Sequence, residues 1–428
     1  MAILFAIMLQ GFTNVVKLKP LDGFVEPKKP VKLSFETYYN GRYQKRLTYL
    51  AQIHTGFREC FIRNYNQLCY TCFGKLNNTN VIVGNNGELF SSMYVEDLTG
   101  VMLEEYYSTV DSAMRQAREN VGLTLRLIDT LKQHGTEFLF VFAPSKPAVY
   151  PEYLPEPYHS RISDFSLIDY YIELFKENNI PFVDFHNGFK QMKDVFPYPL
   201  YAPYGTHWSN ATIPLVADSI LRKIEDLTGK KMPGIEITDL NISSSYSSQD
   251  GELESQFNLV YPLPKPPIPN PVFVLTDTAG AAKPNLLTVA DSHFVLFENT
   301  CFLNAFNSWT FLRYNEYILS SHHEYDWKKI QFLPEAYQIL EDADIVLAVF
   351  TAPKIYDYMF GFPEMALQLL EHGPLTDEES IALVIESIRD NQNWYDAVVK
   401  QAKEQGFTVE ENLRRNAIYI IQTNKTSK

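Results

Sequence analysis

The chain has few cysteines, no long apolar run and no block of basic residues. Among its 428 residues are four cysteines, and the only close pair is Cys69 and Cys72. A single CxxC spacing inside an expected helix, with no second pair, is weak evidence for a zinc or thioredoxin-like site. We therefore expect neither a metal nor a cofactor.

The most apolar stretch, MAILFAIMLQGF at residues 1–12, is shorter than the roughly twenty residues that a membrane-spanning helix needs. It also lacks the basic beginning of a full signal peptide. Two interpretations stay open. The stretch is part of a longer signal or N-terminal membrane anchor, or it is a buried N-terminal element.

The negative charge of the chain argues against nucleic acid and anionic membranes as its main partners. A formal charge of -14 without a Lys/Arg block disfavours nucleic acid and anionic membrane surfaces. A hydrophobic content of 46% with 21% charged residues is typical of a globular protein. The 27 tyrosines and 29 phenylalanines fill cores, and tyrosine also stacks on sugar rings.

The pattern of apolar residues predicts an α/β fold with a central, mostly parallel sheet and helical additions at both ends. We divide the chain into an apolar segment with a linker (1–30), the main domain (31–374) and a helical extension (375–428). Helices are expected at 34–74, 104–133, 167–178, 211–228, 377–390, 394–405 and 409–423. A hairpin with an Asn-Gly turn is expected at 81–90, and strands at 138–142, 180–185, 286–289, 302–306 and 345–350. The polar, proline-rich region 239–283 is interpreted as an irregular insertion over the sheet.

The stretch LLTVADSHF at 286–294 carries the main candidate residue, because an apolar strand ends there in Asp291 and Ser292. The carboxyl ends of parallel strands are where ligands bind in open α/β sheets. A strand-to-helix turn also offers backbone N–H groups to a developing oxyanion. Asp and Ser also end many strands simply because both residues favour turns and helix caps, so this pattern alone does not assign catalysis.

A serine hydroxyl needs a nearby base to become a nucleophile. His207, in the segment Tyr204–Asn210, is the best candidate of nine histidines because a turn and a helix start define its position. The alternative is a structural turn histidine packed on Trp208. His293 adjoins Ser292, but neighbours on an extended chain point to opposite sides.

Taken together, several short motifs in this order resemble the alginate O-acetyltransferase family of AlgJ and AlgX, which has an SGNH-hydrolase-like domain and is related to DHHW-motif proteins. The motifs are Gly56-Phe57-Arg58, the hairpin 81–90, Phe142-Ala-Pro-Ser-Lys146 with Val149-Tyr150-Pro151, Gly205-Thr-His207-Trp208, and Ala290-Asp291-Ser292. The resemblance implies that Ser292 is the nucleophile, with its backbone N–H as an oxyanion donor, and that His207 is the general base.

The sequence departs from the family pattern at the triad acid. Gly205 stands where the family has aspartate, and Ala290 replaces the glycine before Asp291. Losing the orienting acid costs about four orders of magnitude in a serine protease triad. Asp184 or the Tyr204 hydroxyl are candidates to replace it, and Asp291 is a further candidate that more often caps the turn. The expected substrate contacts are Tyr204, Thr206, Trp208, Lys146 and Arg313.

Two functions remain in view. The first is a periplasmic or cell-envelope polysaccharide O-acetyltransferase or acetylesterase that works through an acyl-serine, with a membrane-bound O-acyltransferase partner implied by the resemblance. The second is an inactive carbohydrate-binding or assembly protein of the same fold, which Gly205 favours. A cytosolic lipase-like esterase is disfavoured because the serine lacks a G-x-S-x-G elbow.

Overall fold

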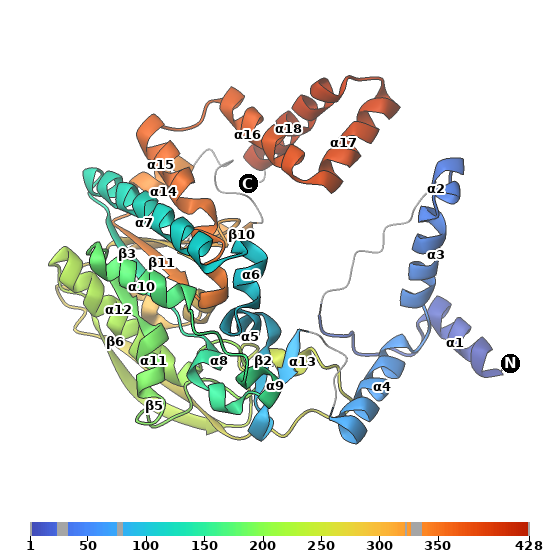
Figure 1. Ribbon diagram of the computed structural model, residues 1–428, viewed down its shortest axis with the longest axis horizontal. Coiled ribbons are helices and arrows are strands. Elements are labelled where there is room, and N and C mark those ends of the chain that lie inside the picture. The colour runs from blue at the N-terminus through green and yellow to red at the C-terminus, as the bar shows by residue number, and fades with distance from the viewer. Residues whose placement is uncertain (1, 24–32, 75–79, 322, 327–335, 427–428) are drawn as a thin grey trace.

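A computed structural model describes residues 2–23, 33–74, 80–321, 323–326 and 336–426. Figure 1 shows an α/β core with the helices α1–α4 at one side and α16–α18 at another. The part of the expected linker that falls at residues 24–30 lies outside the described residues.

The core is a seven-stranded sheet in the order β10-β9-β8-β7-β11-β3-β4, in which β8 to β4 run parallel and β9 pairs antiparallel with both β8 and β10. The strands are β3 (Glu137–Phe142), β4 (Phe182–Asp184), β7 (Asn285–Ala290), β8 (Ser308–Arg313), β9 (Tyr317–Ser320), β10 (His323–Asp326) and β11 (Ile345–Phe350). β11 is buried along its whole length because β7 and β3 flank it and helices cover both faces. Its uninterrupted apolar run is typical of such a strand.

Helices pack on both faces of the sheet. One face buries Phe140, Val289 and Ala348 with α7 (Val110–Gln133), α10 (Leu167–Glu177) and α15 (Phe362–His372). The other face buries Val141, Ala290 and Val349 with α11 (Phe185–Met192) and α12 (Ile213–Thr228). Alternate residues of each strand thus belong to opposite cores, as strand geometry requires. The arrangement is an α/β fold with a mostly parallel central sheet and helical additions.

Shorter helices lie mostly at the ends of the strands and in the loops. They are α5 (Ser92–Leu98), α6 (Val101–Tyr107), α8 (Lys146–Val149), α9 (Glu156–His159), α13 (Glu252–Ser255) and α14 (Ala336–Glu341). The expected helix 104–133 is divided between α6 and α7. Ser108 takes a left-handed conformation with φ 60° between them, which ends the first helix.

Two expectations about strands were wrong. Residues 301–305 form the 3-10 helix η5 (Cys301–Ala305), and the neighbouring strand of the sheet is β8 instead. Region 239–283 is more regular than expected, since β5 (Gly234–Ser243) and β6 (Ile268–Thr276) form a two-stranded antiparallel sheet. β5 is mostly polar and exposed, and β6 begins with Ile-Pro-Asn-Pro, so neither strand has the apolar pattern of a buried strand along its whole length.

The expected hairpin is present as β1 (Val81–Val83) and β2 (Leu89–Ser91). Its connection is longer than a two-residue turn, because the 3-10 helix η1 (Asn85–Gly87) lies between the strands. Asn86 and Gly87 both have positive φ, 57° and 78°, which explains the Asn-Gly pair.

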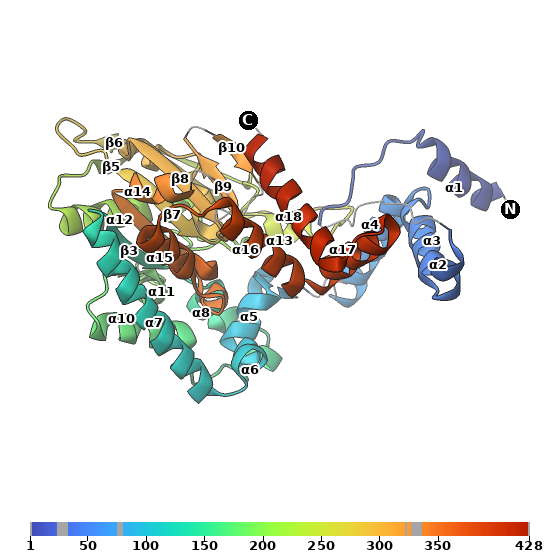
Figure 2. The same cartoon turned by 90° about the horizontal axis from the view of Figure 1, so that it is seen from above.

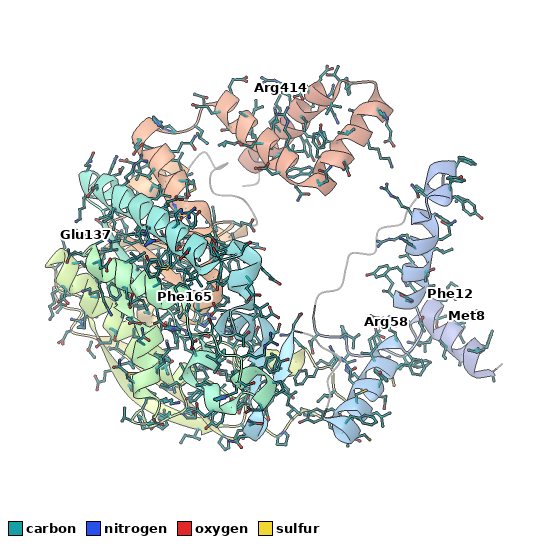
Figure 3. The ribbon with its side chains drawn as sticks, in the orientation of Figure 1. Met8, Phe12, Arg58, Glu137, Phe165 and Arg414 are labelled. Carbon is teal, nitrogen blue, oxygen red and sulfur yellow. The ribbon has the colours of Figure 1, made fainter. Side chains whose placement is uncertain are left out.

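The N-terminal helices are α1 (Ala2–Thr13), α2 (Phe35–Tyr39), α3 (Arg42–Ile53) and α4 (Arg58–Phe73). Both views show them projecting from the α/β layers (Figures 1 and 2). The buried alternative for residues 1–12 was wrong: Met8 and Phe12, labelled in Figure 3, are 52% and 84% exposed. Asn66 of α4 donates to the Phe257 carbonyl at 2.8 Å, which joins this part to the core.

The C-terminal extension forms helices α16 (Asp377–Asp390), α17 (Gln392–Gln405) and α18 (Val409–Thr426), as expected. They enclose an apolar cluster of their own that includes Val384, Ile388 and Leu413. Arg414 of α18, labelled in Figure 3, pairs with Glu378 of α16 at 2.6 Å. Among the described residues, no helix combines the length and the apolar character needed to cross a bilayer.

Candidate active site

The turn after β7 is held by Asp291, whose buried carboxylate joins β7 to β11. It accepts hydrogen bonds from the backbone N–H of His293 at 2.8 Å and from the N–H and hydroxyl of Thr351 at 2.9 and 2.7 Å. Burial opposes the charge, but His293 and these donors outweigh it and lower the pKa of Asp291 to about 2. Asp291 therefore fixes the turn, and its hydrogen bonds do not assign it to orienting His207.

Ser292 begins the 3-10 helix η4 (Ser292–Phe297) at the carboxyl end of β7, and its side chain is half-buried. Its Oγ lies 2.8 Å from Nε2 of His207. His207 comes from the loop before α12, which an isolated bridge between Tyr201 and Trp208 holds in place. This distance is within the reach required between a nucleophile and its general base.

The other ring nitrogen of His207 contacts a carboxylate that the sequence did not single out. Oε1 of Glu252, the first residue of α13, lies 2.9 Å from Nδ1 of His207. The same oxygen accepts the backbone N–H of Thr206 at 2.8 Å. Burial opposes the charge of Glu252, but His207 and Thr206 together lower its pKa. Nδ1 of His207 forms no hydrogen bond that meets the usual geometric limits, so the 2.9 Å approach to Glu252 is a close charge contact.

The absence of a side chain at Gly205 is connected with the position of Glu252. A Cβ added to Gly205 would lie 2.9 Å from the carbonyl oxygen of Gln249 and 3.3 Å from Cα of Asp250. The backbone that leads into α13 therefore occupies the space that an aspartate side chain would need. The residue that departs from the family pattern is the one that lets the segment with Glu252 approach His207.

His293 does not compete for the role of base. It is fully buried, and its ring lies 4.6 Å from that of His207 and 5.4 Å from that of Trp208, centroid to centroid. Burial and the neighbouring His207 lower its pKa, and the nearby Asp291 carboxylate opposes this shift. Ser292 and His293 were expected to point to opposite sides, as neighbours on an extended chain do. They lie instead in a tight 3-10 helix, where that rule does not apply.

Two expected site residues have structural roles. Asp184 caps α11, where its Oδ1 accepts the N–H of Asn187 at 2.8 Å, so it does not replace the missing acid. Lys146, 1% exposed, donates to the carbonyls of Leu89, Ala202 and Pro203 and pairs with Glu88 at 3.0 Å. Its ammonium joins the hairpin β1–β2 to the loop before His207, and the substrate-contact prediction for Lys146 was wrong.

The other residues expected to contact the substrate are Trp208, Tyr204, Thr206 and Arg313, and most of them are buried or bonded within the protein. Trp208 is fully buried against Phe185 and Phe297, so it cannot stack on a substrate. The Tyr204 hydroxyl donates to the Pro264 carbonyl at 2.5 Å and does not orient His207. Thr206, 8% exposed, positions Glu252 through its N–H. Arg313 ends β8 with its guanidinium 5.3 Å from the ring of Tyr314.

The sequence offered no clear signal for Glu252. It lies in the segment Gln249-Asp250-Gly251-Glu252, which reads as an ordinary polar turn about 45 residues from His207 in the chain. Only the packing of this segment against Gly205 brings the carboxylate to the histidine. In the described part of the chain, no group of His, Cys, Asp and Glu is arranged to hold a metal ion.

Comparisons with known proteins agree with this architecture. Residues 99–296 match the family model of the SGNH hydrolase-like domain, acetyltransferase AlgX. This range contains Ser292, His207 and Glu252. None of the curated proteins matches the chain.

Several solved structures are also similar, at low identity. The O-acetyltransferase domain of Pseudomonas putida AlgJ is 17% identical with a TM-score of 0.42, over 68% of this chain and 99% of that one. Pseudomonas aeruginosa AlgX is 13% identical with a TM-score of 0.40, over 67% of each chain. Bacillus cereus PatB1 with a sulfonyl adduct is 14% identical with a TM-score of 0.40, over 58% of this chain and 92% of that one.

Proposed function

Because residues 99–296 match the family model of the SGNH hydrolase-like domain, acetyltransferase AlgX, we propose that this chain is a polysaccharide O-acetyltransferase that works through an acetyl-Ser292 intermediate. The observation that carries the proposal is the continuous line of contacts from Ser292 Oγ through His207 to Glu252. A serine, a histidine and a carboxylate in this order are the groups that covalent acyl transfer needs.

In the first half of the reaction, Ser292 Oγ attacks the carbonyl carbon of the acetyl donor while Nε2 of His207 takes the hydroxyl proton. Glu252 stabilises the imidazolium that forms, because its carboxylate lies 2.9 Å from Nδ1. The backbone N–H of Ser292 is the proposed oxyanion donor. Collapse of the tetrahedral intermediate breaks the bond to the donor oxygen, which takes the proton from His207.

In the second half, an acceptor hydroxyl attacks the acetyl-serine and His207 takes its proton. Collapse then releases the acetylated acceptor and returns the proton to Ser292 Oγ. Water in place of the sugar hydroxyl would make the enzyme an acetylesterase. The family model favours transfer, since it describes an acetyltransferase domain. Transfer also requires that the site exclude water once the acetyl group is bound.

The cellular setting belongs to the same proposal. We place the protein in the periplasm or cell envelope, with a polysaccharide as acceptor and a membrane-bound O-acyltransferase as the supplier of acetyl groups. The exposed apolar side chains of α1, such as Phe5 and Phe12, would suit an N-terminal membrane anchor.

The alternative, an inactive carbohydrate-binding protein, drew its support from Gly205. The contact between Glu252 and His207 weakens that support, because it supplies a carboxylate where the sequence motif has none. The alternative predicts no acyl-enzyme, and the experiment below separates the two.

The test is p-nitrophenyl acetate turnover with mass spectrometry of the intact protein. We expect an acetyl adduct on the wild-type chain that is absent in Ser292→Ala, together with loss of serine-dependent turnover. Ser160→Ala, which changes an exposed serine, serves as the control and should behave as wild type. An adduct that persists in Ser292→Ala, or none in the wild type, would contradict the proposal.

A further inference from the structure

A cavity of about 830 Å³ lies at the same edge of the sheet as Ser292. Its walls come from the loop after β8, the loop after β11, and the helices α6 and α7. Figure 1 shows α6 and α7 adjoining each other on one side of the sheet. The volume is in the range of small-molecule sites, roughly 300–1,000 Å³. None of the catalytic contacts described above uses the residues of this cavity.

Two backbone contacts connect the cavity to the Ser292 turn. Tyr314, which lines the cavity, donates its N–H to the carbonyl of Ala290 at 2.9 Å. Thr351, bound to the Asp291 carboxylate, accepts the N–H of Lys354, another lining residue, at 2.9 Å. The walls therefore start beside Asp291 and Ser292 on the two strands that flank β7.

Aromatic residues are the most numerous group in the lining of the cavity. The lining tyrosines and phenylalanine are Tyr106, Tyr107, Tyr314, Tyr317, Tyr356, Tyr358 and Phe360. The rings of Tyr106 and Tyr107 lie 5.1 and 5.9 Å from that of Tyr356, so they form one connected surface. Tyr106 remains 48% exposed. Such faces suit the apolar face of a sugar ring, and they attract cations.

One acceptor in the wall lacks a partner. Asn315 is 7% exposed, and its Nδ2 donates to the carbonyl of Phe360 at 3.1 Å, but its Oδ1 is buried with no hydrogen bond. A buried carbonyl without a donor is costly, so this position of the wall is under-satisfied in the absence of a small movement that exposes the oxygen to the cavity. Tyr314, Asn315 and Phe360 also have positive φ of 54°, 50° and 52°, a conformation that costs energy for residues other than glycine.

The charges of the wall are mainly negative. Glu316, Asp357 and Glu364 contribute carboxylates, and Lys354 is the lysine of the lining. The Lys354 ammonium lies 6.0 Å from the ring of Tyr314, so part of its charge already faces an aromatic surface. Burial and Asp357 raise the pKa of Tyr106 and Tyr107, which keeps their hydroxyls protonated. The cavity thus disfavours a carboxylate and favours a donor-rich or cationic ligand.

We propose that this cavity binds an amino-sugar unit of the acceptor glycan and so selects against polyuronates. The aromatic wall would hold the sugar ring, the unpaired Oδ1 of Asn315 would accept a hydroxyl or amine hydrogen, and the carboxylates would attract the protonated amine. The proposal rests on the proposed acetyl transfer at Ser292, and it names the class of acceptor for that site.

Binding is measured on the Ser292→Ala protein, so the result does not depend on catalysis. The probes are a β-1,4-linked glucosamine tetramer and a mannuronate tetramer, titrated calorimetrically at low salt. We expect the glucosamine tetramer to bind at least about tenfold tighter than the mannuronate tetramer, a free-energy difference of the size one favourable contact gives. Equal affinities, a preference for mannuronate, or no binding of either would overturn the proposal.

Two variants assign the binding to this cavity. Tyr106→Ala removes an exposed ring of the wall and should weaken glucosamine binding by about tenfold. Tyr261→Ala removes a tyrosine that is 71% exposed outside the lining and serves as the matched control. Glu316→Lys reverses a charge on an exposed side chain and should reduce the preference for glucosamine over mannuronate. Unchanged binding in both Tyr106→Ala and Glu316→Lys would place the binding elsewhere and overturn the proposal.

The two proposals fail separately. A wild-type chain that forms acetyl-Ser292 but shows no preference for glucosamine would contradict only the acceptor class. A Ser292→Ala chain that binds glucosamine, paired with a wild type that forms no adduct, would contradict acetyl transfer and leave a glycan-binding cavity.

Discussion

The carboxyl edge of the sheet and the insertion beside it contribute to the same site in different ways. The sheet edge supplies Ser292 on a turn that is fixed by a fully buried carboxylate, Asp291. The insertion, residues 234–276, supplies Glu252 from the short helix α13, with a side chain that is 26% exposed. One region is part of the core, and the other lies over it.

The comparison shows why two acids near one serine have different tasks. The oxygens of Asp291 are occupied by donors of His293 and Thr351, so its charge stabilises the turn. Oε1 of Glu252 meets a histidine that must gain a proton during the reaction. A carboxylate can stabilise that positive charge only from the Nδ1 side, and the insertion is the region that reaches it.

The largest expected effect is a loss of activity when the carboxylate that the insertion supplies, Glu252, is neutralised. Glu252→Gln keeps the size of the side chain and removes the charge, so Nδ1 of His207 loses its anionic partner. We expect kcat for p-nitrophenyl acetate to fall by about 10³–10⁴, the order found when the orienting acid of a serine protease triad is neutralised. Steady-state kinetics measure it.

Glu254→Gln is the matched control, because it lies on the same helix but pairs with Lys265 at 2.9 Å. An equal loss in both variants would mean that the helix position, and not the Glu252 charge, matters. Restoring the family residue with Gly205→Asp in the Glu252→Gln background should not recover activity, since the Gln249 carbonyl occupies that space. Recovery would show that the motif position still accepts an acid.

The second expected effect is a loss of stability when Lys146, which joins the hairpin β1–β2 to the loop before His207, is replaced. Lys146→Met leaves Glu88 and the carbonyls of Leu89, Ala202 and Pro203 without their shared ammonium. Removing one partner of a buried ion pair costs about 3–5 kcal/mol. We expect urea unfolding to show a loss of that order in the free energy of unfolding, compared with Lys230→Met at an exposed position. A loss no larger than in Lys230→Met would contradict the structural role.

The smallest expected effect concerns Asp291 and acid. Its pKa is lowered from 3.8 to about 2 in the folded chain, so it adds stability above pH 4 that is lost as the pH falls through 2. Such a shift corresponds to about 2 kcal/mol. Asp291→Asn should therefore remove a decrease of that size between pH 4 and pH 2, measured by urea unfolding at several pH values.

Asp226→Asn, at an exposed position, is the control and should keep the slope of the wild type. If the free energy of unfolding of Asp291→Asn fell between pH 4 and pH 2 as much as that of the wild type, the charge of Asp291 would not stabilise the turn.

Much of the sheet could be predicted from sequence, because buried parallel strands such as β3, β7 and β11 are short apolar runs with clear ends. The apolar residues 302–306 predict a strand, but they form η5, and the strand of the sheet is the more polar β8 that follows, because tertiary packing decides between the two. The strand β6 contains Pro269 and Pro271, which edge strands tolerate, and its partner β5 is mostly polar, so the sequence did not indicate this pair.

The sequence by itself determined the α/β pattern, the turn at Asp291 and Ser292, and the pairing of that serine with His207 as candidates. These depend on local patterns and on motifs whose order along the chain is informative. The tertiary structure alone decided that Glu252 is the acid near His207, that Lys146 and Trp208 are buried, and that tyrosines from three separate stretches of the chain line one cavity. The reason is that a carboxylate or an aromatic ring acts through its distance to other groups, and the fold sets this distance between residues that are far apart in the chain.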